Sequence, residues 1–165
     1  MPDIPEDHRF EQFFFDSSTT TRLARVAMGY RRPLLLCMPS LAERLEAAGH
    51  PYRLLDRDTR FRHLTGWQRW DLMKPELVFE DFDAILCDPP FANVTLPDLA
   101  RAVDLLAAGT PETPALHLAY IDTREASLLR AFAHHGLRRH FGPLGYRSVK
   151  ASTQARIAWY GPAPG

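Results

Sequence analysis

The sequence lacks a net charge, a long hydrophobic run and a signal-like N-terminus. Its twenty acidic and twenty basic side chains cancel, so no global field draws the protein to nucleic acid or to an anionic membrane, and a polyanion would need a local group of basic residues. No apolar run approaches the ~18 residues that span a bilayer, so we expect no membrane contact. Residues 1–7 are acidic and rich in proline, unlike a secretory signal, which is basic and then apolar. We therefore expect a cytoplasmic protein.

Cysteine is also scarce, and its placement argues against disulfides and metal clusters. Cys37 and Cys87 each end an apolar run, as buried, reduced thiols do in a reducing compartment. None of the seven histidines pairs with a cysteine at ligand spacing. The adjacent His134 and His135 are not expected to converge on one ion, because neighbours on a helix do not face each other. We therefore expect no metal site.

The 165 residues suffice for one compact unit, and we expect a single domain over residues 1–165. Four segments begin at a capping residue, carry apolar residues at helical spacing and end at glycine: 17–29, 40–49, 95–109 and 122–136. Ser40 and Glu43 predict a capping box in the second of them. Short apolar runs predict buried strands at 33–38, 52–56, 82–87 and 115–121.

Two further strands complete the predicted sheet. One fits either 67–71 or 77–79, of which we favour 67–71. Residues 156–160 alternate as a strand does and follow no crossover helix, so this last strand is expected to run antiparallel. Strands alternating with helices predict a Rossmann-like, doubly wound α/β fold with a mostly parallel sheet. Such folds bind ligands beyond the carboxyl ends of the strands, where the strand order reverses.

The motif Asp88-Pro89-Pro90-Phe91 follows the predicted strand 82–87. Its two prolines remove two backbone donors and fix two φ angles, which leaves the Asp88 carboxylate and the Pro89 carbonyl as a rigid pair of acceptors. Such a pair suits an amine with two hydrogens, and it would localise the lone pair of an adenine amine for attack on an electrophile. Phe91 would offer a stacking surface for the base. The alternative is an ordinary Asp-Pro-Pro turn.

This motif resembles motif IV of the adenine N6-methyltransferases that use S-adenosylmethionine, and the wider sequence resembles one subfamily of them. That subfamily includes the lysine methyltransferase of elongation factor 1A and a zinc-finger CCHC methyltransferase of ribosomal RNA. The shared blocks are 11–15 with 20 and 23–24; 37–41; 54–56 with 58, 60 and 61; 82–85 leading into 88–91; and 147–160. The resemblance implies a class I methyltransferase with S-adenosylmethionine as cofactor.

The turn after the first predicted strand departs from the usual class I pattern. No two glycines are separated by a single residue, and Met38-Pro39-Ser40 replaces the Gly-x-Gly turn. The subfamily carries the same substitution, so Pro39 and Ser40 are expected to meet the cofactor. Backbone N–H groups at this helix start would bind the methionine carboxylate. The alternative role of Ser40 is simple capping.

Further cofactor contacts are expected at the ends of neighbouring strands. Asp56 ends the second strand, where a carboxylate can accept from both ribose hydroxyls; its alternative is a turn residue. Asp71, at the end of the favoured third strand, would accept from the adenine amine. The resemblance implies contacts to the methionine end from Gln12, Phe13, Phe15 and Thr20. At least one of the phenylalanines at 13–15 is expected only to dock the first helix.

RNA, above all ribosomal RNA, is the expected substrate, because the chain has no separate module that reads DNA sequence. The expected phosphate contacts are Arg60, Arg138, Arg139 and Arg147; the alternative is that they form a solvated surface. Three other functions stay open: lysine methylation of a translation protein, adenine methylation of DNA, and a catalytically degenerate Rossmann scaffold.

Overall fold

The computed structural model describes residues 4–10, 12–90 and 92–163. Its centre is a seven-stranded sheet in the order β3-β2-β1-β4-β5-β7-β6. Strands β1 to β5 pair in parallel, and β7 runs antiparallel to both β5 and β6. The predicted doubly wound, mostly parallel sheet with an antiparallel last strand is therefore confirmed. The strands are β1 (Pro33–Leu36), β2 (Arg53–Asp56), β3 (Trp67–Arg69), β4 (Ala84–Cys87), β5 (Ala115–Ile121), β6 (Leu137–Phe141) and β7 (Ile157–Pro162).

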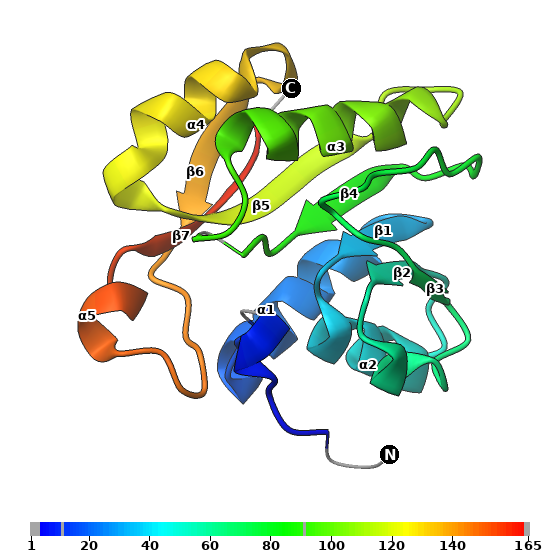
Figure 1. Ribbon diagram of the computed structural model, residues 1–165, viewed down its shortest axis with the longest axis horizontal. Coiled ribbons are helices and arrows are strands. Elements are labelled where there is room, and N and C mark those ends of the chain that lie inside the picture. Colours follow the sequence, from blue (N-terminus) through cyan, green and yellow to red (C-terminus); the bar gives the residue numbers. More distant parts are fainter. Residues whose placement is uncertain (1–3, 11, 91, 164–165) are drawn as a thin grey trace.

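Helices cover both faces of the sheet, with α1 and α2 on one face and α3 and α4 on the other (Figure 1). Each face has its own cluster of buried apolar side chains, with Leu23 and Leu41 in one cluster and Leu99 and Leu128 in the other. This burial explains why β1 and β4 are apolar along their whole length. The α-helices are α1 (Ser17–Met28), α2 (Pro39–Ala47), α3 (Leu96–Ala108), α4 (Glu125–Ala131) and α5 (Ala151–Gln154). The 3-10 helices are η1 (His8–Phe10), η2 (Thr59–Phe61), η3 (Asp122–Arg124) and η4 (Ala133–His135).

Strand β6 is absent from the sequence prediction. Only Leu137 is buried along it, and its three middle residues are exposed, because the strand lies at the edge of the sheet. An edge strand needs no apolar run, so hydrophobic patterning does not reveal it. The predicted helix 122–136 is correspondingly shorter, since η3, α4 and η4 share it and the left-handed Gly136 ends it before β6.

Helix α2 begins two residues earlier than a cap at Ser40 predicts, and the predicted capping box of Ser40 and Glu43 is wrong. Met38 is the N-cap, it makes no side-chain capping bond, and Pro39 occupies the first turn. Proline suits this position because its fixed φ is already helical and its missing N–H would have no helical partner. Ser40 is therefore inside the helix, where its side chain is not needed as a cap.

The N-terminal segment is fixed against the segment before β7. Phe15 and Tyr146 form an isolated antiparallel bridge. Asp16, the N-cap of α1, donates its backbone N–H to the carbonyl of Gly145 at 2.9 Å. A side chain at position 145 would overlap the Asp16 carboxylate, so this close approach requires glycine. Segments more than a hundred residues apart in sequence thus meet on the α1 face.

Both cysteines are free thiols, Cys87 buried and Cys37 partly buried. Burial raises the pKa of each thiol well above its ordinary value, which keeps them protonated and unreactive. This agrees with the expectation of buried, reduced thiols. No helix within the described ranges has both the length and the apolar content needed to cross a membrane.

Candidate active site

A cavity of about 330 Å³ lies where β1, β2 and β4 end. The strand order reverses between β1 and β4, which is where doubly wound folds bind their ligands. Seven of the eight predicted cofactor residues line this cavity, together with two residues of the motif. They are Gln12, Phe13, Phe15, Pro39, Ser40, Asp56, Asp71, Asp88 and Pro90.

Thr20 is the predicted cofactor residue that lies outside the described lining of this cavity. It is buried in α1, and its hydroxyl donates to the backbone carbonyl of Asp16 at 2.8 Å. This bond stabilises the first turn of the helix. Thr20 therefore stabilises the start of α1 and does not line the cavity directly.

The N-terminal segment forms one wall of the cavity through Gln12 and the phenylalanines beside it. Gln12 donates from Nε2 to the Asp58 carboxylate at 3.1 Å and accepts from the Arg60 guanidinium at 3.2 Å. Arg60 also pairs with Asp58 at 2.8 Å. The predicted substrate residue Arg60 thus belongs to a network that holds the N-terminal wall against the segment after β2.

The turn after β1 replaces the missing Gly-x-Gly. Cys37 has a φ of +60°, a left-handed conformation that favours glycine, and its N–H donates to the carbonyl of Leu55 at 3.1 Å. Pro39 and Ser40 line the cavity directly after this turn. The first N–H groups of a helix have no partner within it and carry its positive dipole end. The start of α2 can therefore bind a carboxylate without a glycine turn.

Asp56 places a buried carboxylate in the cavity wall at the end of β2. The residue is only 8% exposed, and it accepts the backbone N–H of Asp58 at 2.8 Å. Burial raises the pKa of Asp56 to about 6, although that hydrogen bond acts in the opposite direction. A carboxylate held in this way is ionised at neutral pH and suits ligand hydroxyl groups.

Asp71 lines the cavity, but not from a strand. The predicted strand 67–71 ends at Arg69, and Asp71 lies in the following turn, where its carboxylate accepts the N–H of Met73 at 2.9 Å. Trp70, between them, is buried and also lines the cavity, with its indole N–H donated to the carbonyl of Glu76 at 3.0 Å. Trp70 is not among the site residues predicted from the sequence, although a tryptophan at a strand end indicates a flat apolar wall.

A second cavity of about 370 Å³ adjoins the first, and the two share Phe13, Asp88 and Pro90 in their lining. Pro89 lines the second cavity only, as does Tyr146, a residue that sequence reasoning missed. The remaining described lining is mostly apolar or small: Ser148, Val149, Lys150, Thr153 and Ile157. The motif therefore forms the boundary between two adjoining cavities.

Tyr146 contacts the motif through a hydrogen bond. Its hydroxyl donates to Oδ1 of Asp88 at 3.1 Å, and its ring packs against Phe15 with centroids 4.8 Å apart. Burial, followed by the neighbouring Asp88 charge, raises the pKa of the Tyr146 phenol well above its ordinary value, so the hydroxyl stays a donor. Asp88 also continues the sheet, since its N–H donates to the carbonyl of Leu36 at 3.2 Å. Phe91 lies outside the described residues.

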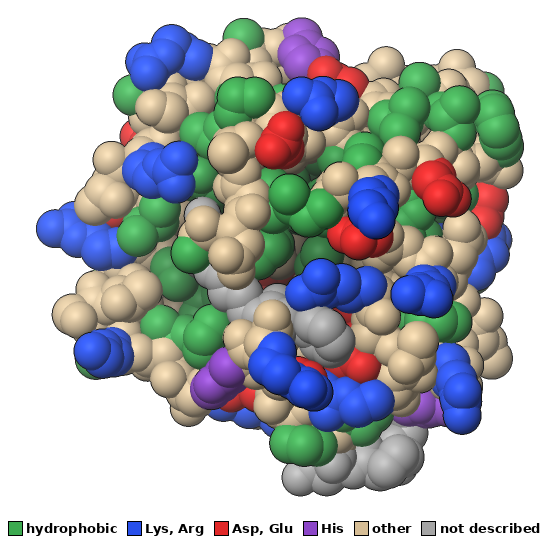
Figure 2. Space-filling view, in the orientation of Figure 1, with side chains coloured by type: hydrophobic (Ala, Val, Ile, Leu, Met, Phe, Trp, Pro, Cys, Tyr) green, Lys and Arg blue, Asp and Glu red, His purple; other side chains and the backbone are tan. Residues whose placement is uncertain are grey.

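The other predicted basic residues occupy two places. Arg147 is exposed, and its guanidinium carbon lies 5.5 Å from the ring centre of Phe14 in the first cavity wall. Arg138 and Arg139 lie on β6 at the edge of the sheet, outside the described lining of both cavities. Arg139 is partly neutralised by Asp122 at 3.3 Å. Figure 2 shows basic side chains scattered over this face among acidic ones, without a single basic patch.

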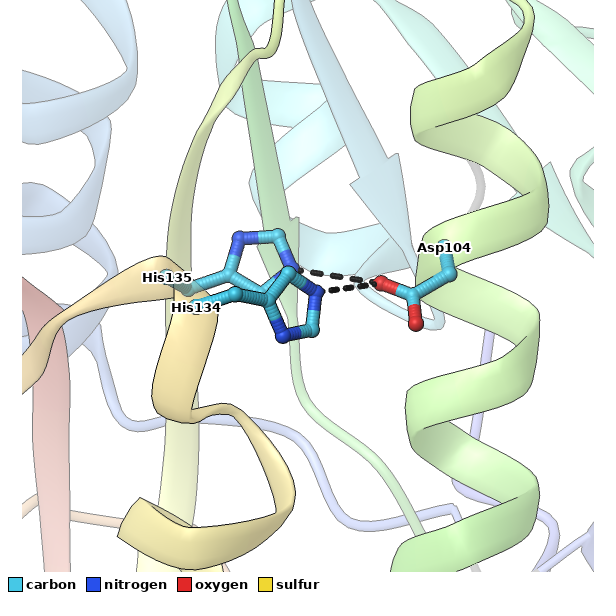
Figure 3. Close-up of side chains that lie close together, drawn as sticks. All are labelled: Asp104, His134 and His135. Atoms are coloured by element: carbon cyan, nitrogen blue, oxygen red, sulfur yellow. Dashed lines mark hydrogen bonds and ion pairs between the residues drawn. The ribbon is translucent and has the colours of Figure 1, made fainter.

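His134 and His135 are not expected to converge on one ion, yet their rings meet at one carboxylate oxygen. The Nε2 atoms of His134 and His135 lie 2.9 Å and 3.4 Å from Oδ1 of Asp104, and their ring centroids are 4.2 Å apart (Figure 3). The helical spacing rule concerns residues that face each other on one helix. Here both side chains reach across to another helix, α3, which carries Asp104.

Comparison with known proteins identifies a family for the chain and confirms its fold. The sequence model of a family described as "Probable N6-adenine methyltransferase" matches residues 6–135. No curated protein sequence matches the chain. Among solved structures, the branched-chain polyamine synthase of Thermus thermophilus, in complex with N4-aminopropylspermidine and 5'-methylthioadenosine, superposes with a TM-score of 0.71 and 16% identity, covering 95% of this chain and 59% of that one.

Two methyltransferase structures also resemble this chain in fold at low sequence identity. The N-methyltransferase NodS of Bradyrhizobium japonicum WM9, in complex with S-adenosyl-L-homocysteine, has a TM-score of 0.61 at 14% identity and covers 94% of this chain and 91% of that one. Magnesium protoporphyrin IX methyltransferase (ChlM) of Synechocystis PCC 6803, with bound SAM, has a TM-score of 0.61 at 14% identity and covers 88% and 79%. The identities are too low to carry more than the fold. On the family match, the chain belongs to the probable N6-adenine methyltransferase family and has the class I methyltransferase fold.

Proposed function

We propose that this protein transfers a methyl group from S-adenosylmethionine to the N6 amine of an adenine in RNA, with ribosomal RNA as the foremost candidate. The observation that carries the proposal is the position of Asp88 and Pro90 in the lining of both cavities. A group-transfer enzyme must bring a donor and an acceptor together at one point. Asp88 and Pro90 lie between the two cavities, where such a point would be.

S-adenosylmethionine is the cofactor of this methyltransferase, and the residues of the first cavity fit it. The cavity volume of about 330 Å³ falls within the range of small-molecule sites. Asp56 offers a buried carboxylate to the ribose hydroxyls, Trp70 an apolar wall to the adenine, and the start of α2 backbone N–H groups to the carboxylate. When bound, the cofactor supplies a methyl group made electrophilic by its positively charged sulfur, which leaves as a neutral thioether.

Asp88 and the prolines would orient the acceptor amine from the side of the second cavity. Tyr146 holds one oxygen of the Asp88 carboxylate, which fixes the direction in which the group accepts further hydrogen bonds. Accepting N–H bonds from the amine concentrates its lone pair on nitrogen, which then forms the bond to the methyl carbon. Once methylated, the nitrogen is positively charged and its N–H is strongly acidic. The proton therefore passes to Asp88 or to water, and no strong base is needed.

The mostly apolar lining of the second cavity supports an aromatic base as the acceptor. A lysine acceptor is charged in water and would first have to lose a proton. Phosphate contacts would come from Arg147 beside the cavities, and from Arg138 and Arg139 along β6 if the polymer extends to that edge. Arg60, which pairs with Asp58 and donates to Gln12 beside the first cavity, would add a further phosphate contact there.

Transfer of labelled methyl groups tests this function. The full chain is incubated with radiolabelled S-adenosylmethionine and cell lysate, and the product is divided among RNase, DNase and protease treatments. We expect RNase alone to release the label and nucleoside analysis to find N6-methyladenosine. Label released by protease or DNase would overturn the RNA assignment. Label unchanged by the Asp88→Asn substitution would overturn the role of the motif.

A further inference from the structure

Asp104, His134 and His135 form a compact cluster away from both cavities. Asp104 lies on α3, and the two histidines lie in η4, between α4 and β6 (Figure 3). One nitrogen of each ring and one carboxylate oxygen all lie within 4.8 Å of one another. Strand β6 runs antiparallel to β7, which runs antiparallel to β5, so β6 has the same direction as β5. The start of β6, and η4 before it, therefore lie at the opposite end of the strands from the cavities.

The cluster has the geometry of a first-row metal site. Zinc binds histidine nitrogen and carboxylate oxygen at about 2.0–2.2 Å, so two ligand atoms of a tetrahedral ion are roughly 3.4 Å apart. The Nε2 atoms of His134 and His135 lie 2.9 Å and 3.4 Å from the same Asp104 oxygen. Both rings thus aim at one point, and a small shift of the carboxylate would let an ion occupy the space between the three atoms.

The cluster is held in place on one side and open on the other. The His135 side chain is only 4% exposed, and its ring packs against the fully buried Phe132 with centroids 5.8 Å apart. The side chains of His134 and Asp104 are 58% and 49% exposed. One ligand is therefore fixed by the core, while the other two leave a path for an ion and room for a water ligand.

We propose that Asp104, His134 and His135 bind a divalent ion of the zinc type that joins α3 to the start of β6. Two imidazoles and one carboxylate form a donor set of intermediate softness, which suits Zn²⁺ and excludes a preference for Ca²⁺ or Mg²⁺. Three protein ligands leave the fourth position to water. Because the site lies at the opposite end of the strands from the cavities, it is separate from the methyl-transfer chemistry. The ion would instead link α3 to η4 and so stabilise the fold.

Zinc titration of the full, tag-free and chelator-treated chain tests the site. By calorimetry we expect one Zn²⁺ per chain, and we expect the Co²⁺-loaded chain to show the visible absorption of a four-coordinate ion. His134→Gln and Asp104→Asn should each weaken zinc binding by about tenfold or more, because each removes a ligand. The control His63→Gln changes an exposed histidine outside the cluster and should leave the affinity within about twofold.

Two results would overturn this proposal: a wild-type chain that binds no stoichiometric zinc, or ligand variants that bind it as tightly as the wild type. Asp104→Asn is isosteric and exposed, so it should preserve the fold, and binding of S-adenosylhomocysteine checks this. We also expect zinc to raise the melting temperature of the wild type and of His63→Gln more than that of Asp104→Asn, since an ion that binds only the native state stabilises it in proportion to its affinity.

Discussion

The hydroxyl of Tyr146 donates a hydrogen bond to the Asp88 carboxylate at 3.1 Å, while the same tyrosine pairs with Phe15. Three segments distant in sequence therefore meet at one carboxylate: the N-terminal wall, the end of β4 and the segment before β7. A carboxylate positioned from two directions has a defined orientation before any ligand arrives, which is the condition for efficient catalysis.

Replacing Tyr146 by phenylalanine should slow methyl transfer without weakening cofactor binding. The variant loses one hydrogen bond to a charged group, worth about 1.5–3 kcal/mol, so we expect kcat to fall by about tenfold or more. The affinity for S-adenosylhomocysteine should stay within about twofold, because Tyr146 lines only the second cavity. The control is Tyr52→Phe, which loses a hydroxyl bond to Glu46 outside both cavities. Equal losses in both variants would assign Tyr146 a structural role only.

Asp88→Asn should remove activity while keeping the fold. The amide has the shape of the carboxylate but lacks its charge and one acceptor, so the amine loses its orienting partner. We expect kcat to fall by about 10²-fold or more, with calorimetric affinity for S-adenosylhomocysteine and the melting temperature close to those of the wild type. Near-normal turnover would contradict the role assigned to this residue.

Cofactor binding should weaken in mild acid. Burial raises the pKa of Asp56 to about 6, and the ionised form accepts hydroxyl bonds better than the protonated form. Binding therefore favours loss of the proton, so the affinity for S-adenosylhomocysteine should be constant above about pH 7 and fall by about tenfold per pH unit below 6. In Asp56→Asn the affinity should be lower at pH 8 and should change little between pH 5 and pH 8. A wild-type affinity that is flat over this range would exclude Asp56 from the ribose contact.

Arg147→Gln should reduce the salt dependence of RNA binding. Each phosphate contact contributes about one unit to the slope of log affinity against log salt concentration. We expect a decrease of about one for Arg147→Gln, and a decrease in the same direction for the double variant Arg138→Gln and Arg139→Gln. Arg101→Gln, on the exposed side of α3 and paired with Asp98, is the control and should leave the slope unchanged. A slope for Arg147→Gln equal to that of Arg101→Gln would remove Arg147 from the interface.

The sheet could be predicted from sequence where strands are buried on both faces. β5 was predicted to the residue, and β1, β2 and β4 to within about two residues, because their apolar runs have no other explanation. The edge strand β6 gave no such signal, since Arg138 and Arg139 face solvent. The start of α2 was misplaced because Pro39 and Ser40 both suit a helix start, and only the structure shows which of them is first.

One part of the first cavity could be predicted from the strand pattern, because Pro39, Asp56 and Asp88 follow strands of one parallel sheet. The N-terminal wall with Gln12 and Phe13 follows no strand, and only the resemblance to a family implied it. The second cavity could not be predicted, since Tyr146 lies before the shared block 147–160 and outside the predicted helices and strands, and the fold alone brings it to Asp88. The same limit applies to Asp104 and the two histidines, which are thirty residues apart and meet across two elements.

The packing of the segment before Ser17 against the rest of the fold affects how a truncated protein would behave. Phe13 belongs to the walls of both cavities, yet the described residues before Ser17 precede the first α-helix and contribute no strand to the sheet. A shortened protein that begins at Ser17 loses this wall of both cavities together with two buried core side chains, Phe14 and Phe15, and with Asp16, the N-cap of α1. Loss of activity in such a fragment would therefore reflect the missing N-terminal wall of the cavities and would not show that the full chain is inactive.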